Sequence, residues 1–273
     1  VFRLSNATVS PHARAIPSDL RMCPLQKRLA HSDGGRALPV QGGQAGRTGR
    51  AKKQPLYAAT EIRYLRVGMT MRIASYNIRK AVGLDWRRDP DRILDVLGEI
   101  EADIVVLQEA DRRYGARAGV LPLDRLQRDV GLTLAEVSVR PRSHGWHGNV
   151  VLARERLTIR SAERLSLPYV DPRGAVRVVL DHHRLEVIGT HLGLTPGTRR
   201  RQLSRLMSGM HQAKRPIILA GDFNEWNDAN FRLVDSLTLV TPGPSFLAAR
   251  PIGALDRFVV NKAVRVLGTH VHR

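Results

Sequence analysis

The chain has 273 residues, of which 42% are hydrophobic and 25% charged, and this is enough for one large globular domain or at most two. The single cysteine excludes an intramolecular disulfide framework and a cysteine-cluster metal site, and no uninterrupted apolar run is long enough to span a membrane. Lys and Arg outnumber Asp and Glu by 44 to 25, which favours anionic partners such as nucleic acid or phosphate-bearing substrates. We expect a monomeric cytoplasmic protein in a reducing compartment.

Residues 1–70 differ in composition from the rest of the chain. They hold 12 Lys and Arg against three Asp and Glu, include turn-rich segments such as Ser32-Asp33-Gly34-Gly35, and lack sustained apolar periodicity. This pattern predicts a disordered basic tail. The chain opens with Val, and two methionines, Met69 and Met71, precede the first clear strand pattern. An alternative is therefore that the natural start lies there, and the charge of the tail is not taken as evidence for nucleic-acid binding.

From Met71 onward the sequence alternates strand and helix patterns. Residues 72–77 alternate like a strand, Asp89 and Pro90 mark a helix start, and residues 104–107 form the apolar run of a buried strand. Further predicted elements are helices over 123–130 and 197–211 and strands over 132–139, 149–153, 175–180, 185–189, 217–220, 255–260 and 264–268. The series predicts one α/β domain of two packed sheets with helices outside, over residues 71–273.

Several of these apolar strands begin or end in a carboxylate, an amide or a histidine. The candidates are Asn77, Glu109, Asn149, His191, Asp222 with Asn224, and Asp256. Because buried polar groups cost free energy unless they are paired, so many placements at strand ends indicate a shared purpose. Carboxylate and amide oxygens suit Mg²⁺ or Mn²⁺, while His, Asp and Asn can donate to a phosphate, accept a proton and orient water. Together they favour metal-assisted hydrolysis of a phosphate ester.

In chain order, the motifs that contain these residues resemble the signature of the endonuclease/exonuclease/phosphatase superfamily of metal-dependent hydrolases. The motifs are Ser75-Tyr76-Asn77-Ile78, Leu107-Gln108-Glu109, Gly148-Asn149, Gly189-Thr190-His191-Leu192, Gly221-Asp222-Phe223-Asn224 and Leu255-Asp256-Arg257-Phe258. The resemblance covers residues 71–273 and implies a four-layer α/β sandwich. It implies that Glu109, assisted by Asn77, ligates Mg²⁺, and that Asp222 orients or deprotonates the attacking water.

The resemblance assigns the other candidates to the substrate and to a final histidine. Asn224 would position the water or the phosphate, and Asn149 and His191 would contact the phosphate. Asp256 matches the acid that pairs with a histidine in a terminal Ser-Asp-His motif. The sequence given ends at Thr269-His270-Val271-His272-Arg273 without that motif. We therefore expect a domain that lacks its final strand and exposes the edge of the strand it would pair with.

Two functional hypotheses follow. The first is a Mg²⁺- or Mn²⁺-dependent phosphoesterase that hydrolyses phosphodiester or phosphomonoester bonds; a phosphodiesterase of nuclease type is favoured because residues 71–273 are themselves basic. The alternative is a non-catalytic basic protein that binds polyanions after losing the terminal motif.

Overall fold

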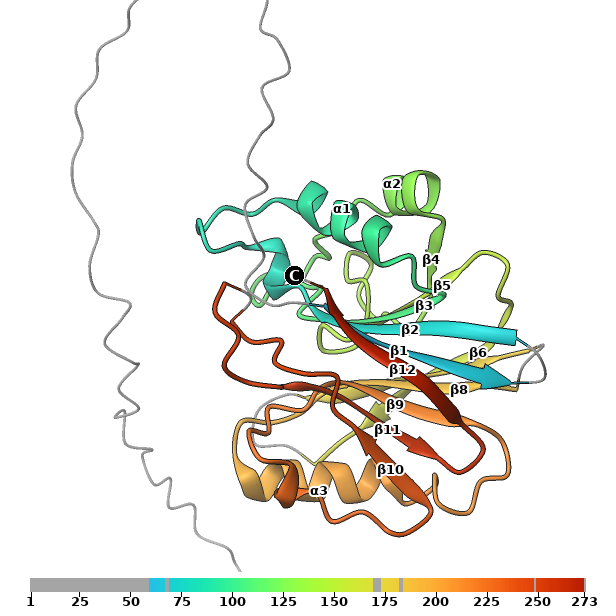
Figure 1. Ribbon diagram of the computed structural model, residues 1–273. Helices are drawn as coiled ribbons and strands as arrows, with labels where there is room; N and C mark the ends of the chain where they lie inside the picture. Colours follow the sequence, from blue (N-terminus) through green and yellow to red (C-terminus); the bar gives the residue numbers. More distant parts are fainter. Residues whose placement is uncertain (1–58, 67–68, 169–172, 182–183, 248, 273) are drawn as a thin grey trace, which may run out of the picture. The chain divides into compact units, whose positions relative to one another are not determined.

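The computed structural model describes residues 59–66, 69–168, 173–181, 184–247 and 249–272. Two six-stranded sheets lie face to face, and helices cover their outer faces (Figure 1). One apolar cluster fills the space between the sheets, and two more lie between each sheet and its helices. The predicted four-layer α/β sandwich is confirmed.

The first sheet contains the candidate residues Asn77, Glu109 and Asn149 at or beside strand ends. Its order is β12-β1-β2-β3-β5-β4. The bounds are β1 Ala59–Arg66, β2 Met69–Asn77, β3 Ile104–Gln108, β4 Leu132–Leu134, β5 Val150–Arg154 and β12 Arg265–His272. β2 and β3 are parallel, whereas β5 runs antiparallel to β3.

The second sheet contains His191, Asp222 and Asp256. Its order is β10-β11-β9-β8-β7-β6. The bounds are β6 Ile159–Ser166, β7 Gly174–Leu180, β8 Glu186–His191, β9 Ile217–Asp222, β10 Leu237–Val240 and β11 Asp256–Asn261. β8 and β9 are parallel, and β11 runs antiparallel to β9. Each sheet thus has one central parallel pair flanked by antiparallel strands.

The helices are short and pack on the outer faces. α1 (Pro90–Ile100) begins at the Asp89 carboxylate, which accepts a hydrogen bond from the backbone N–H of Arg92, and it buries an apolar stripe against the first sheet. α2 (Leu123–Arg125) and the helical turn that follows it lie in the same layer, and α3 (Pro196–Met207) covers the second sheet. In the part of the chain that the structure covers, no helix is both long and apolar enough to cross a bilayer.

The expectation of a disordered tail over residues 1–70 is wrong for residues 59–66 and 69–70, which lie in strands. Residues 59–66 form β1, which pairs antiparallel with both β2 and β12, and β2 itself begins at Met69. β1 therefore covers one edge of β2 and joins it to β12. Three of the eight β1 residues are charged, which obscures the alternation that marks a strand. Residues 1–58 and 67–68 lie outside the described residues.

Other differences concern lengths and two edge strands. The strand predicted over 132–139 ends at Leu134, and the helix predicted over 197–211 ends at Met207. β6 and β10 were not predicted. β6 has only intermediate or exposed side chains, because it lies at the edge of its sheet, so its sequence carries little apolar signal.

Two truncations test the role of β1. Removing residues 1–68 deletes β1, whereas removing residues 1–56 keeps it. The longer truncation should lower the melting temperature of the chain by several degrees relative to the shorter one, because β2 and β12 both lose their ladder partner. Thermal unfolding followed by circular dichroism measures the difference. Equal melting temperatures would mean that β1 contributes nothing to stability.

Candidate functional site

The two sheets bring the candidate residues to one edge of the sandwich. In the parallel pairs, Asn77 lies opposite Gln108 and His191 opposite Asp222, so the carboxyl ends of β2, β3, β8 and β9 share a direction within each sheet. The antiparallel strands β5 and β11 begin where their partners end, which places their first residues at the same edge. Polar groups separated by as many as 181 residues in sequence therefore meet in space.

A hydrogen bond between the sheets lies at the centre of the site. The Asn77 amide Nδ2, at the end of β2, donates to the Asp222 Oδ2 at the end of β9 over 2.9 Å. His191 Nε2 lies 3.5 Å from the same carboxylate oxygen. The other oxygen, Asp222 Oδ1, accepts the backbone N–H of Asn224 at 2.9 Å. All of these groups except Asn224 are buried.

Asp256 lies beside Asp222 across the β9–β11 ladder. Its carboxylate accepts hydrogen bonds from the hydroxyls of Ser75 at 2.9 Å and Ser245 at 2.6 Å. The neighbouring Arg257 does not neutralise it through an ion pair, because alternate strand residues face opposite sides of the sheet. Arg257 instead pairs with Asp228 at 2.7 Å. Two fully buried carboxylates thus lie next to each other at the end of the second sheet.

Burial and like charge set the ionisation of these groups. Burial raises the pKa of Asp222, and the nearby Glu109 adds to the rise. Burial also raises the pKa of Asp256, with Asp222 as the next cause. Burial lowers the pKa of His191 well below its ordinary value, and Arg173 and Lys80 lower it further. His191 is therefore a neutral imidazole at neutral pH.

Glu109 lies at the solvent side of the cluster. Its carboxylate is about a quarter exposed and forms an ion pair with the ammonium of Lys80. The Lys80 backbone N–H also donates to the Glu109 carbonyl oxygen at 2.9 Å, which holds the two residues together. Asn77 connects to this segment as well, because its Oδ1 accepts the Arg79 backbone N–H at 3.0 Å.

The oxygens of Glu109 and Asn77 suit a hard divalent cation such as Mg²⁺. Mg²⁺ keeps several waters and often binds through one or two carboxylates, so a partly exposed carboxylate beside an amide oxygen fits its chemistry. Among the described residues, no group of three or more His, Cys, Asp or Glu is arranged as a metal centre. The Lys80 ammonium would compete with such a cation for the Glu109 carboxylate.

Asn149 links the two sheets on the other side of the site. Its Nδ2 donates to the backbone oxygens of Gly174 at 3.0 Å and Trp146 at 3.2 Å. Its Oδ1 is buried and has no hydrogen-bond partner among the described residues. The structure gives Asn149 no direct contact with the Asn77–Asp222 pair, so it is placed at the same edge but not within the hydrogen-bonded cluster.

The backbone is unusual where the strands end. Gly221 has φ +150°, and a Cβ there would lie 1.9 Å from the Thr190 backbone oxygen, so only glycine allows β8 and β9 to meet at this point. Glu109 and Asn224 adopt left-handed φ values of 54° and 50°, and Lys80 adopts 58°. Such conformations cost about 1–3 kcal/mol each and occur often at functional sites.

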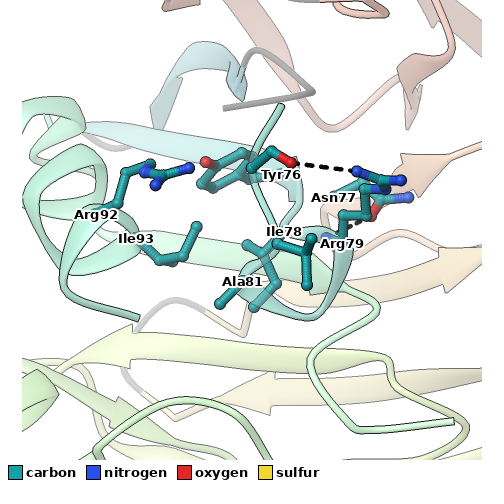
Figure 2. A pocket seen from close by; sticks show the side chains of 9 residues that line it. Tyr76, Asn77, Ile78, Arg79, Ala81, Arg92 and Ile93 are labelled. Carbon is teal, nitrogen blue, oxygen red and sulfur yellow. Dashed lines mark hydrogen bonds between the residues drawn. The ribbon is translucent and has the colours of Figure 1, made fainter. Parts of the chain in front are cut away.

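The end of β2, which carries Asn77, packs against side chains of α1. A cavity of about 10 Å³, the size of one water molecule, lies between Tyr76, Ile78, Arg92 and Ile93 (Figure 2). The Arg92 side chain extends from α1 toward the buried Tyr76 hydroxyl. Burial of Tyr76 raises the pKa of its hydroxyl, which therefore stays protonated at neutral pH.

Sequence analysis missed three residues of the cluster. Ser75 lies in a quoted motif but had no role, Ser245 lies in a loop without a strand pattern, and Arg173 directly precedes β7. Arg173 acts electrostatically on both His191 and Asp222. The one available signal was the position of Arg173 at the start of a strand whose partner, β8, ends in a candidate histidine.

The chain matches known proteins in sequence and in structure. It is 30% identical over 141 residues to the uncharacterised protein YbhP of Escherichia coli K12, which covers 46% of this chain and 55% of YbhP; the same holds for YbhP of Shigella flexneri. The chain thus spans about half the length of the curated relatives it matches.

Solved structures share the fold. An endonuclease/exonuclease/phosphatase protein from Beutenbergia cavernae gives a TM-score of 0.52 at 23% identity, covering 70% of this chain and 64% of that one. Truncated Caenorhabditis elegans TDP2 gives 0.55 at 15% identity, covering 74% and 84%. D. rerio TDP2 complexed with single-strand DNA product gives 0.51 at 16% identity, covering 69% and 82%.

The family comparison extends over most of the chain. Residues 74–273, which include every candidate residue and all strands from β3 onward, match the endonuclease/exonuclease/phosphatase family. This match covers far more than half of the sequence. It agrees with the two-sheet sandwich and with the polar cluster at its edge. The chain belongs to the endonuclease/exonuclease/phosphatase family.

Proposed function

We propose that the protein is a Mg²⁺- or Mn²⁺-dependent phosphoesterase, with a phosphodiesterase of nuclease type as the favoured activity. The observation that carries this proposal is the buried cluster in which Asn77 from one sheet and His191 from the other both lie against the Asp222 carboxylate. Family membership supports hydrolysis of a phosphate ester at this place. The test is Mg²⁺-stimulated turnover of plasmid, oligonucleotide or bis-p-nitrophenyl phosphate.

The chain's own residues supply a base and a binding surface for an anion. Ionised Asp222 accepts a proton from an attacking water, and the side chain of Asn224, two residues further along, orients that water or the phosphate. Neutral His191 donates a hydrogen bond to a phosphate oxygen. Lys80 and Arg173 place positive charge close to His191, which favours a negatively charged ester in the site.

Glu109 and Asn77 are the residues that would hold the divalent cation. When bound, such a cation polarises the phosphoryl oxygen and neutralises developing negative charge. Asn149 contributes through its buried and unpartnered Oδ1, which can accept a hydrogen bond from a substrate or from water. Asp256 keeps Ser75 and Ser245 in place, and burial and the charge of Asp222 beside it raise its own pKa.

Exposed aromatic residues beside arginines favour a nucleic-acid substrate. Trp86 is 70% exposed, and its ring centroid lies 4.6 Å from the Arg79 guanidinium carbon. Arg79 is two residues beyond Asn77 in sequence. Tyr114 is 80% exposed and lies near the Arg113 guanidinium at 5.9 Å. Exposed rings can stack on unpaired bases while arginines contact the phosphates. The single-strand DNA product bound to D. rerio TDP2, a relative in fold, agrees with this choice.

One contact favours a non-catalytic alternative. The Lys80 ammonium already neutralises Glu109, the carboxylate assigned to the cation. A protein in which this pair persists would bind polyanions without hydrolysing them. Steeply salt-dependent nucleic-acid binding together with no Mg²⁺-stimulated turnover would support this alternative and contradict the phosphoesterase.

Asp222→Asn should lower the turnover of a phosphodiester about 10²–10⁴-fold, because the amide keeps the shape of the side chain but cannot accept the proton. Asp235→Asn, at an exposed position outside the site, is the matched control and should leave the rate unchanged. The rate of the parent should also fall on acidification at a higher pH than an ordinary aspartate would give, because the pKa of Asp222 is raised. Parental turnover by the Asp222 variant would contradict the assigned role.

Glu109→Gln should weaken binding of Mn²⁺, used as a spectroscopic substitute for Mg²⁺, by about tenfold or more, equivalent to about 1.4 kcal/mol. Electron paramagnetic resonance of free Mn²⁺ measures this without any turnover. Glu136→Gln, an exposed glutamate elsewhere, is the control. Lys80→Met should have the opposite effect and tighten Mn²⁺ binding, since it removes the competing ammonium. Unchanged binding in both site variants would place the cation elsewhere.

Asp256→Asn should stabilise the fold more at pH 8 than at pH 5. The raised pKa of Asp256 means that the folded state holds its proton more tightly than the unfolded state does. The stability that this adds is fully present at pH values below the ordinary pKa of an aspartate. It is lost as the pH rises through the folded-state pKa of about 7. The asparagine removes the buried charge and can still bond both serine hydroxyls, which rotate to suit. Melting temperatures of variant and parent at the two pH values give the result. A difference that does not grow with pH would refute the assignment of a buried, protonatable Asp256.

A further inference from the structure

A second cavity lies on the far face of the second sheet. It has a volume of about 360 Å³ and is bounded by strands β6 to β9, the carboxyl-terminal end of α3 and the turn that follows α3. It lies where β8 begins, at Glu186, whereas the candidate site lies where β8 ends, at His191. Five residue steps along a strand span about 16 Å, so the two places are separate.

The floor of this cavity is apolar. It is formed by side chains from three strands and from α3, namely Leu165, Ile188, Ile217, Leu206 and Met210. Four of these side chains are buried, and Leu165 is partly buried against the same apolar cluster. A volume of this size, with an apolar floor, lies within the range of pockets that hold small organic ligands.

The rim is strongly basic. Four arginines line the cavity, Arg164, Arg177, Arg205 and Arg215, against a single acidic residue, Glu186. Arg177 is already paired, because its guanidinium donates to Glu163 Oε1 at 3.2 Å and its buried Nε faces Glu186 Oε1 at 3.8 Å. No ion pair or side-chain hydrogen bond of the Arg205 guanidinium occurs within the part of the chain that the structure describes. Arg205 therefore retains its donors for a ligand.

The negative groups around the cavity are already neutralised. Glu186 is buried and pairs with Arg215 at 2.6 Å, and its other oxygen lies 3.8 Å from Arg177. The last carbonyls of α3 would also repel an anion, but Ser208 and Met210 donate hydrogen bonds to the oxygens of Ser204, Arg205 and Met207. The cavity therefore presents net positive charge above an apolar floor.

We propose that this cavity binds an amphipathic organic anion, a carboxylate or phosphate head joined to an apolar body of acyl-chain type. The head pairs with Arg205, and the apolar body contacts Ile188 and Met210. An inorganic anion would leave the apolar part of the cavity unfilled, and a neutral hydrocarbon would leave the Arg205 guanidinium without a partner. The site is independent of the proposed phosphoesterase activity.

Isothermal titration calorimetry of the full chain with decanoate, with decanol and with inorganic phosphate tests the proposal. Decanoate should bind saturably with one site per chain, and the two half-ligands should bind at least about tenfold more weakly. Arg205→Glu should weaken decanoate binding about fivefold or more, because it reverses an exposed charge at the rim. Arg200→Glu, exposed on the same helix but outside the cavity, should not.

A second pair of variants tests the location without changing charge. A Cβ at Gly209, which lines the cavity, meets no atom within 4 Å, so Gly209→Trp adds a ring beside the cavity from a position where the Cβ itself causes no clash. Gly98→Trp, on α1 in the opposite layer, is the matched control because its Cβ is equally free. Loss of decanoate binding only in the Gly209 variant supports the proposal. Binding that survives in Gly209→Trp, binding of phosphate as tight as that of decanoate, or no saturable binding would each overturn it.

Discussion

The hydrogen bond from the Asn77 amide to the Asp222 carboxylate joins the two sheets at the point where charge is buried most deeply. A carboxylate removed from water is costly unless its oxygens are satisfied, and Asp256 adds a second one beside it. Ser75 provides one of the needed hydroxyls from the opposite sheet. The relative position of the sheets is thus fixed by polar groups at this edge as well as by the apolar cluster between them. Gly221 contributes by letting β8 and β9 approach closely there.

Charge in the site is arranged with acids inside and cations around them. Asp222 and Asp256 have raised pKa values because they are buried together, while burial, with Arg173 and Lys80 adding to it, keeps His191 neutral. A proton acceptor and a neutral donor side by side suit hydrolysis of an anionic ester better than either would in water. The ion pair of Lys80 with Glu109 neutralises the carboxylate on the solvent side of the site.

Most of the fold and of the candidate cluster could be predicted from the sequence, because the polar residues of the cluster directly follow apolar strands. A polar residue that directly follows an apolar strand, such as Asn77 or Asp222, is visible as a break in a short pattern. Ser245 was invisible because its loop has no periodicity, although it bonds Asp256 as closely as Ser75 does. The pairing of sheets across 145 residues, which brings Asn77 to Asp222, could be inferred only through the family resemblance.

Electrostatic relations were the least predictable part. The sequence shows that Asp256 is next to Arg257, and a simple expectation would pair them. The strand geometry instead sends Arg257 to Asp228 and leaves Asp256 to two serines. Likewise β1 was hidden because charged residues, Glu61 and Arg63 among them, interrupt its alternation, yet Glu61 is buried and pairs with Arg72 of β2 at 3.3 Å.

The position of β1 between β2 and β12 has a consequence for the order of folding. β1 and β2 are neighbours in sequence, so their antiparallel pairing closes only a short loop and can form in microseconds, as isolated hairpins do. β12 pairs with β1 from roughly 200 residues away. Closing so long a loop costs chain entropy before the strand pairing contributes any favourable free energy. The hairpin therefore forms an early template, and docking of β12 onto it is a late event. Until that event the outer edge of β1 stays open, and the nascent chain is most prone to pair with another copy during this interval.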